Sequence, residues 1–548
     1  MPPCSAPASV PPPAPVPESP SPPDCHEAVQ SMLSLIASEW GTSPHPDRRE
    51  KPVVRYREPS ALRKDLEEMS KMPMTISNSG LSSSADGANQ LTTALRAFQD
   101  LSVDTSHPYF FNQLFGPLDP AALAGELLSC AQNTSGYTYE AAPVYSMLEV
   151  EVMKTLASLI GWDWETEGDG LMVPGGSLAN SYAMHVARHH FFPETRDEGN
   201  AAVGAPLVAF AATEAHYSFL KGCGLLGLGR NNLVKVECDE TGAMDPSKLD
   251  DAIKAAKAAG KVPFFVGATA GSTVRGTFDP IDKIADVCEA HGNLWLHVDG
   301  AWGGSALYSQ RERVRSVLNG IERCDSFSTN PHKMLGSPLQ ASQFVSRHKG
   351  ILNRTNASNA TYLFDKRKKG AEYDLGDSTF TCGRKTDGLK IWSMLKYRGL
   401  DGISERVNHG VDLLDALAAK VRARPCFVLA CAPWLFNVNF YYLPAAARTL
   451  LAEAGMATDG STEESKGFEL PDAVGEMLEP VAVDIKLAMQ VAGEALVPFQ
   501  PIAIQRAQAF RIVMAGDRSD FTEADLDHLL DTIERYGALE EEAKMKKK

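Results

Sequence analysis

Short apolar segments alternate with amphipathic segments between about residues 161 and 420, and this pattern limits the fold more than any other feature of the chain. Helical patterns, such as those over residues 245–259 and 280–291, separate the apolar runs. Strands that alternate with helices are typical of a mostly parallel sheet covered on both faces. We therefore predict a large α/β domain over residues 161–420. Its apolar runs cover residues 207–211, 264–268, 294–298 and 326–329.

The segments on either side of this region have a different character. Residues 1–50 begin with a dense run of Pro, Ser and Ala, which offers too little apolar surface to bury, so we expect a disordered tail. Residues 51–160 mix helical stretches with polar loops and predict an N-terminal helical arm. Residues 421–548 have the pattern of a small α+β domain. Its predicted strands are residues 426–430 and 435–441, and its final helix is residues 522–536.

The overall charge argues against two classes of partner. The chain has 548 residues and a formal net charge of −16, and an acidic surface repels both nucleic acid and anionic membranes. No apolar run reaches the roughly 18 residues that cross a bilayer, and the N-terminus has the features of neither a signal nor a transit peptide. The 10 cysteines show no paired CxxC spacing, which favours reduced thiols. We therefore expect a cytoplasmic protein.

The strongest chemical signal lies where two apolar runs end in polar side chains. Lys333 closes Ser328-Thr329-Asn330-Pro331-His332-Lys333, and Asp299 closes His297-Val298-Asp299 after the preceding run. An amine and a carboxylate at neighbouring strand ends can face one flat ligand from opposite sides. Pyridoxal 5′-phosphate (PLP) requires this division of labour, because its aldehyde binds a lysine amine and its ring nitrogen stays protonated beside a carboxylate. We predict that Lys333 and Asp299 hold PLP.

A glycine-rich turn offers a place for the phosphate group. Pro174-Gly175-Gly176-Ser177 follows the apolar Leu171-Met172-Val173 and precedes a helical pattern. Backbone N–H groups at the N-terminus of a helix bind anions. We predict that Gly175, Gly176 and Ser177 bind the phosphate of the cofactor.

Several motifs in series resemble the group II PLP-dependent amino acid decarboxylases, in particular the acidic amino acid branch of glutamate, cysteine-sulfinate and aspartate decarboxylases. The resemblance runs from about residue 108 to residue 536. It implies PLP fold type I (aspartate-aminotransferase-like): a large domain with a mostly parallel sheet, an N-terminal helical arm and a small α+β C-terminal domain. It also implies a homodimer with shared active sites. The motifs are Phe111-Asn112-Gln113-Leu114, His297-Val298-Asp299-Gly300-Ala301-Trp302-Gly303-Gly304, Asn330-Pro331-His332-Lys333 and Thr381-Cys382-Gly383-Arg384.

The resemblance implies roles for further residues around the cofactor. His216 matches the family histidine that stacks on the pyridine ring and helps to orient the substrate carboxylate. Thr269 matches the position beneath the ring, and Ala301 packs against the ring face in relatives. Asn330 and His332 flank Lys333 and assist phosphate binding or the active-site network.

The resemblance also implies residues that act on the substrate. In relatives a mobile loop supplies a tyrosine as the proton donor, and in the matching loop Tyr373 is the only tyrosine in reach, without a clean equivalent. Arg511 matches the arginine that grips a substrate carboxylate, for which a fork of donors is suited. The predicted substrate-binding residues are Phe111, Gln113, Phe115 and Arg511.

Phe115 bears on the choice of substrate. Glutamate decarboxylases have small polar residues after Asn-Gln-Leu, whereas this chain has Phe115-Gly116-Pro117, and a bulky Phe115 favours shorter substrates. We expect cysteine sulfinate, with cysteate and aspartate as related substrates, to give hypotaurine, taurine and β-alanine with CO₂. Gly116 replaces the family serine and Thr329 replaces the usual tryptophan, so the pocket differs from either branch.

Four alternatives remain open. They are a glutamate decarboxylase that forms GABA, a non-catalytic homologue that binds PLP, an aminotransferase of the same fold, and a metal-dependent lyase. The last would use His185 and His189, which have one-turn helical spacing, but Val186 stands where a zincin carries its glutamate. We therefore predict no metal site.

Overall fold

The computed structural model describes residues 29–30, 32–34, 46–76, 86–358, 360, 362–364, 367–456, 469–502 and 507–547. Most of the tail predicted over residues 1–50 lies outside these residues. The chain divides into two compact units: Met1–Thr42 with Arg57–Ser102, and Ser43–Tyr56 with Val103–Lys548. In the first unit, helices α2 (Pro59–Ser70) and α3 (Gly87–Leu101) pack against each other.

A seven-stranded sheet organises the second unit. The strand order is β1-β7-β6-β5-β4-β2-β3, and only β7 runs antiparallel to its neighbours. The predicted mostly parallel sheet is therefore confirmed, and each of the four apolar runs forms one of its central strands. The strands are β1 (Asp169–Val173), β2 (Leu207–Ala212), β3 (Leu233–Val236), β4 (Val262–Thr269), β5 (Trp295–Gly300), β6 (Ser326–Thr329) and β7 (Ser342–Ser346).

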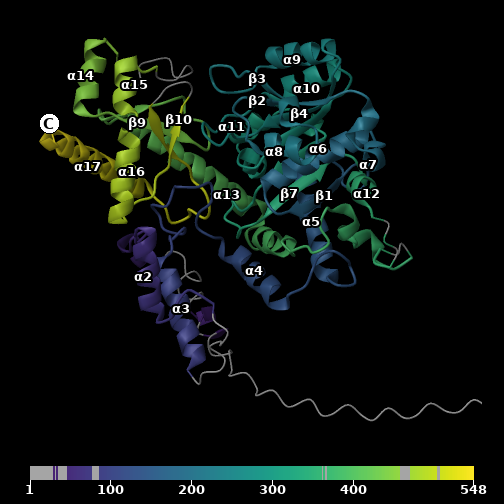
Figure 1. Cartoon of the computed structure of the whole chain (residues 1–548), viewed down its shortest axis with the longest axis horizontal. Helices are drawn as coiled ribbons and strands as arrows, with labels where there is room; N and C mark the ends of the chain where they lie inside the picture. The colour runs from purple at the N-terminus through teal and green to yellow at the C-terminus, as the bar shows by residue number, and fades with distance from the viewer. Residues whose placement is uncertain are drawn as a thin grey trace, which may run out of the picture. The chain divides into compact units, whose positions relative to one another are not determined.

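Helices cover both faces of this sheet, as predicted. In Figure 1, β2 and β4 lie between α9 and α10 on one side and α6 and α8 on the other. Helix α6 contacts β1, β7, β6, β5 and β4, whereas α9 and α10 contact β3, β4 and β5. The helices are α4 (Pro120–Gln132), α5 (Pro143–Ile160), α6 (Gly176–Phe191), α7 (Thr195–Glu198), α8 (Ser218–Leu225), α9 (Pro246–Ala258), α10 (Ile281–Ala290), α11 (Glu312–Arg315) and α12 (Ile351–Asn356).

A smaller antiparallel sheet follows, with the strand order β10-β11-β9-β8. It confirms the predicted α+β character of the C-terminal part. The last helix runs farther than the predicted residues 522–536, because Glu and Lys residues near the end are good helix formers and Lys546 pairs with Glu542 one turn away. The elements are β8 (Phe427–Leu429), β9 (Val438–Tyr442), α14 (Ala445–Glu453), α15 (Asp472–Leu478), α16 (Val481–Ala492), β10 (Phe499–Pro501), β11 (Gln508–Ile512) and α17 (Glu523–Lys547).

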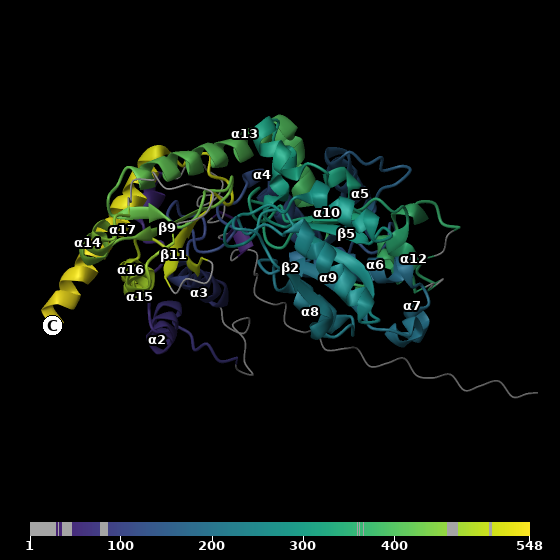
Figure 2. The ribbon, with the colours of Figure 1, turned by 90° about the horizontal axis from the view of Figure 1, so that it is seen from above.

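Helix α13 (Gly388–Arg422) joins the hydrophobic cores of the two sheets, and Figure 2 shows it extending from one to the other. Its first part contributes Ile391 and Val407 to the core of the large sheet, and its last part contributes Leu417 and Val421 to the core of the small sheet. The helix is kinked at Gly399, whose φ of 67° is open to glycine at little cost. The predicted domain limits at residues 160 and 420 stay predictions.

The described helices were also compared with the length and apolar character that crossing a membrane requires, and none of them meets both.

Candidate active site

A cavity of about 230 Å³ opens where the parallel strands end. The register places Thr269 of β4 beside Asp299 of β5, and Gly300 beside Thr329 of β6. The loops that follow these strands therefore meet at one edge of the sheet. Most residues predicted to bind the cofactor line this cavity, namely Gly176, Ser177, His216, Thr269, Asp299, Ala301, Asn330 and Lys333.

The two predicted residues that are not in the lining have identifiable contacts. Gly175 is the residue before α6 and has a φ of 102°, a conformation that other residues rarely adopt. The ring of His332 is buried and bonded through Nδ1 to the backbone of Ala341. Gly175 thus shapes the turn, and His332 holds the loop after β6 in place.

Gly176 shows how closely the chain approaches the cavity. A Cβ atom at this position would lie 2.9 Å from Nδ2 of Asn330 and 3.3 Å from Cβ of Ala301. Any side chain at position 176 would fill the space beside the first turn of α6. No side chain caps the backbone N–H groups of this turn, because the residue before the helix is Gly175. This space at a helix N-terminus is suited to an anion.

Lys333 has an amine that loses its proton readily. Burial lowers its pKa to about 8, which Asp299 opposes and Arg511 assists, although part of its surface still reaches the cavity. Burial also lowers the pKa of His216, again against the effect of Asp299. A lysine that lies in a cleft and has a pKa close to neutral pH is the usual form of a nucleophilic amine.

We predict that covalent capture of PLP by the cofactor-free protein accelerates with pH. The neutral amine is the reactive form, so its fraction rises nearly tenfold per pH unit below the folded pKa and levels off above about 8. The check is the rate at which the absorbance of the lysine adduct appears between pH 6 and pH 9. Pyridoxine 5′-phosphate, which lacks the aldehyde, serves as the control and should bind without this rise. An equal rise for both ligands would contradict the prediction.

Asn180 is a site residue that the sequence analysis missed. It lies on α6, is buried, and donates from Nδ2 to Oδ2 of Asp299 at 2.7 Å and to Oγ of Ser218 at 2.8 Å. Ser218 in turn bonds to Nδ1 of His216 at 2.9 Å. The available signal was an asparagine inside a helical pattern just after Gly-Gly-Ser, since a polar residue of low helix propensity is costly there unless its side chain is bonded.

The structure does not bring the predicted substrate-binding residues into the wall of this cavity. Arg511 comes nearest: it donates from Nη1 to the backbone oxygen of Thr273, which lines the cavity. Burial lowers the pKa of Arg511 to about 10, and its Nε has no hydrogen-bond partner among the described residues.

The aromatic residues predicted for the substrate lie elsewhere in this chain. Phe111 packs edge-on against Phe521 in the core of the small sheet, and Phe115 packs against Phe110. Gln113 is exposed. Tyr373, the predicted proton donor, lies in the short helix Ala371–Tyr373 with its ring 5.7 Å from that of Tyr139. A single chain therefore does not place these four residues at the cavity.

The two histidines considered for a metal lie on α6 away from the cavity. His185 bonds through Nδ1 to Arg188, and burial lowers its pKa to about 4. In the part of the chain that the structure describes, no group of three or more His, Cys, Asp or Glu side chains has the arrangement of a metal site.

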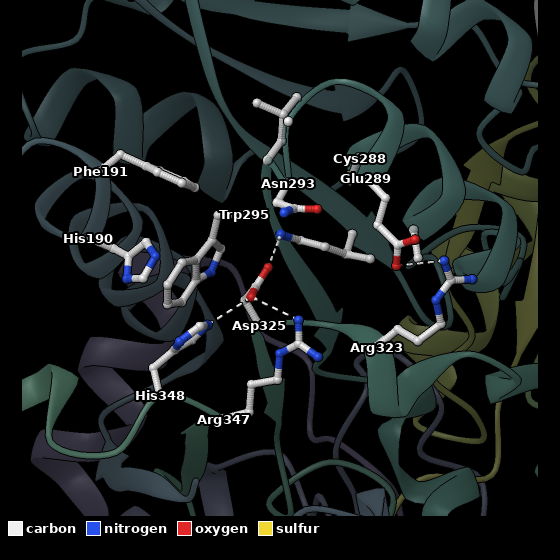
Figure 3. A pocket seen from close by; sticks show the side chains of 14 residues that line it. His190, Phe191, Cys288, Glu289, Asn293, Trp295, Arg323, Asp325, Arg347 and His348 are labelled. Atoms are coloured by element: carbon white, nitrogen blue, oxygen red, sulfur yellow. Dashed lines mark hydrogen bonds and ion pairs between the residues drawn. The ribbon is translucent and has the colours of Figure 1, made fainter.

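A second pocket, of about 550 Å³, lies at the opposite edge of the sheet, where β5 and β6 begin (Figure 3). Its central acid is Asp325, which accepts hydrogen bonds from the backbone N–H of Leu296 and from Nε2 of His348, both at 2.8 Å, and pairs with Arg347. The charges in this wall are paired with one another, which is the arrangement of a structural cluster.

We predict that Asp325→Asn destabilises the protein by about 1–3 kcal/mol, because a mostly buried carboxylate loses bonds that tie the starts of two strands together. The check is the midpoint of urea unfolding of the cofactor-free protein. Asp286→Asn is the matched control, since Asp286 also pairs with an arginine but is 57% exposed, and such a pair contributes about 0–1 kcal/mol. Equal shifts in the two variants would contradict the prediction.

Comparisons with known proteins agree with this geometry. The chain matches the pyridoxal-dependent decarboxylase conserved domain over residues 72–443. It is 40% identical over 489 residues to cysteine sulfinic acid decarboxylase of Homo sapiens, which covers 88% of this chain and 91% of the relative. It is 37% identical over 488 residues to acidic amino acid decarboxylase GADL1 of Xenopus tropicalis, with 88% of each chain covered.

A solved structure shows the same fold. The crystal structure of mouse CSAD aligns with a TM-score of 0.81 at 36% identity, covering 93% of this chain and 98% of that chain. This likeness confirms the predicted fold type I. The matched domain and the two relatives also confirm the predicted cofactor, PLP, and the predicted class of enzyme, a carboxy-lyase. The chain therefore belongs to the family of pyridoxal-dependent decarboxylases, in its acidic amino acid branch.

Proposed function

We propose that this enzyme removes the α-carboxylate of cysteine sulfinate to give hypotaurine and CO₂, with cysteate and aspartate as related substrates. The observation that carries the decarboxylase assignment is the cavity at the strand ends, where Lys333, Asp299 and His216 line one space. The choice of cysteine sulfinate draws support from the relative that is 40% identical and bears that name. It also draws support from Phe115 if the partner chain brings this residue to the site, as proposed below, because its size favours short substrates.

The cavity fits PLP on two independent observations. Oγ1 of Thr269 and Oδ1 of Asn330 are buried in its wall without a hydrogen-bond partner among the described residues, so the site is incomplete without a polar ligand. The missing side chain of Gly176 leaves room beside the first turn of α6. We assign the phosphate to Gly176, Ser177 and Asn330 at this turn. When bound, PLP supplies an electron sink for the bond that releases CO₂.

Each residue around the ring then has a defined task. Lys333 offers the amine that binds the aldehyde, and its lowered pKa keeps that amine reactive. Asp299 would keep a proton on the ring nitrogen of bound PLP, and His216 would help to hold the ring. Arg511, whose Nε is free of partners among the described residues, lies behind Thr273 and provides a cation for a substrate carboxylate.

We further propose that a second copy of the chain completes the site. Gln113, Phe115 and Tyr373 do not reach the cavity of their own chain, whereas a homodimer with shared sites would bring them from the partner. Phe111 is 1% exposed and stays in the core of its own chain. Tyr373 is our candidate for the proton donor to Cα of the substrate. We place the enzyme in the cytoplasm, where the 8 described cysteines, all free, would stay reduced.

We predict that kcat/KM for cysteine sulfinate exceeds that for glutamate by at least about tenfold, because one extra methylene in a tight pocket changes transition-state binding by about 1–3 kcal/mol. The check is a panel of cysteine sulfinate, cysteate, aspartate and glutamate on PLP-loaded protein, with CO₂ and amine both measured. A 2-oxo acid formed without CO₂, with the cofactor left in its pyridoxamine form, would mark an aminotransferase. A higher value for glutamate would overturn the substrate choice in favour of GABA formation, and no CO₂ from any substrate would favour a non-catalytic homologue.

A further inference from the structure

Asn180 uses every hydrogen-bonding position of its side chain within the protein. Its amide nitrogen donates to Asp299 and Ser218, and its carbonyl oxygen accepts from Nε2 of His297 at 3.0 Å and from Oγ of Ser328 at 3.5 Å. All of these partners are buried. A buried amide that makes four bonds has one orientation, because flipping it would set its oxygen against a carboxylate.

A chain of buried side chains fixes this orientation from behind. Nε1 of Trp295 donates to Oγ of Ser326 at 2.9 Å, and an indole N–H can only donate. Oγ of Ser326 lies 2.9 Å from Nδ1 of His297 and can donate its own proton to that nitrogen while it accepts from Trp295. Burial lowers the pKa of His297 to about 4, which favours a neutral ring, and we assign its single proton to Nε2 because that nitrogen faces the carbonyl oxygen of Asn180.

The other end of this series of hydrogen-bonded side chains, Trp295, is anchored at the opposite edge of the sheet. The ring of Trp295 stacks on His348 with centroids 4.7 Å apart and meets His190 edge-on at 5.4 Å (Figure 3). Trp295 is itself 1% exposed. The indole N–H of Trp295, which begins this series of hydrogen bonds, is thus held rigidly. Each hydrogen bond from Trp295 to Asn180 is donated toward Asn180.

The two N–H groups of Asn180 act on the two side chains that face the cofactor. One bonds Oδ2 of Asp299, while Oδ1 accepts from the backbone N–H of Ala301 at 3.0 Å, so the plane of the carboxylate is set from both sides. The other bonds Oγ of Ser218, whose proton is then free for Nδ1 of His216. His216 consequently presents Nε2–H as its remaining donor.

We propose that Asn180 is a positioning residue for the decarboxylation: one amide aims the carboxylate of Asp299 at the ring nitrogen of PLP and, through Ser218, sets the tautomer and orientation of His216. This role rests on the proposed placement of PLP between these two side chains. It acts through Asp299 and His216, and the part that acts through Asp299 depends on the ring nitrogen that Asp299 faces.

The test compares two ligands of the cofactor-free protein. PLP and 1-deazapyridoxal 5′-phosphate, in which carbon replaces the ring nitrogen, are titrated into wild type and Asn180→Leu, and the dissociation constants are measured by fluorescence. We expect Asn180→Leu to weaken PLP binding at least about tenfold more than binding of the carbon analogue, since a hydrogen bond to a charged group is removed. Asn408→Leu is the control, because Asn408 is also a buried helical asparagine bonded to serines, on α13. It should change the two constants equally.

Equal weakening for both ligands in Asn180→Leu would overturn the proposal and leave Asn180 a purely structural residue. A wild-type protein that binds neither ligand would overturn the proposed cofactor site instead, which distinguishes the two failures.

A second measurement needs no variant. In wild-type protein labelled with ¹⁵N-histidine, we expect NMR to show His297 and His216 as neutral rings protonated at Nε2. A proton on Nδ1 of His297 would reverse the direction of the chain and overturn the proposal even if the leucine variant fails to fold.

Discussion

Lys333→Ala should reduce the rate of decarboxylation at least about a thousandfold, because the amine that binds the aldehyde of PLP has no substitute in the cavity wall. The same change should abolish the label that borohydride leaves when it reduces the bond between lysine and cofactor. The two measurements are the CO₂ released from cysteine sulfinate and the mass of the labelled peptide. Both effects follow from one property of the site, the lowered pKa of an enclosed amine.

Lys235→Ala is the matched control. Burial lowers the pKa of Lys235 as well, but its amine bonds to the backbone oxygen of Ala212 and does not line the cavity. This variant should keep both the label and the activity. A label that survives in Lys333→Ala, or one that disappears in Lys235→Ala, would show that the lysine has been assigned wrongly.

The sequence predicted β2, β4, β5 and β6 of the large sheet from short apolar runs between helical patterns. All six residues of β2 are buried, as are all six of β5, and both stand out as apolar runs. Strand β7 does not, because Ser342, Gln343 and Ser346 are polar and yet buried in it. Its antiparallel direction was equally hidden, since the short connection from β6 carries no directional signal.

The same contrast divides the residues of the site. Residues at or shortly after the carboxyl end of a strand, such as Asp299 in β5 and Lys333 after β6, were predictable because parallel strands deliver their carboxyl ends to one edge. Arg511 and Tyr373 depend on how distant segments are placed, which no local pattern encodes. The order of the hydrogen bonds around Asn180 depends on buried partners from α6, α8, β5 and β6, and only the folded chain shows it.

Asp299→Asn should lower kcat by about 100- to 1000-fold, the loss that follows when one preorganised charge beside the reacting group is removed. Asparagine has nearly the same shape, and its one oxygen can still accept from either Asn180 or Ala301, so the fold should survive. What it lacks is the negative charge that keeps a proton on the ring nitrogen. Without this charge bound PLP would be a weaker electron sink, so the release of CO₂ would slow even when substrate binds normally.

The loss should therefore appear in kcat more than in KM, measured with cysteine sulfinate at saturating PLP. Asp169→Asn is the control for a neutralised acid. Burial raises the pKa of Asp169 to about 6. Asp169 lies at the start of β1, away from the cavity, and accepts a hydrogen bond from the backbone N–H of Leu352. It should leave kcat within about threefold of wild type, as expected of a site that touches no reacting atom. If Asp299→Asn were equally mild, the carboxylate could not be the partner of the ring nitrogen, and the orientation proposed for PLP in this cavity would be wrong.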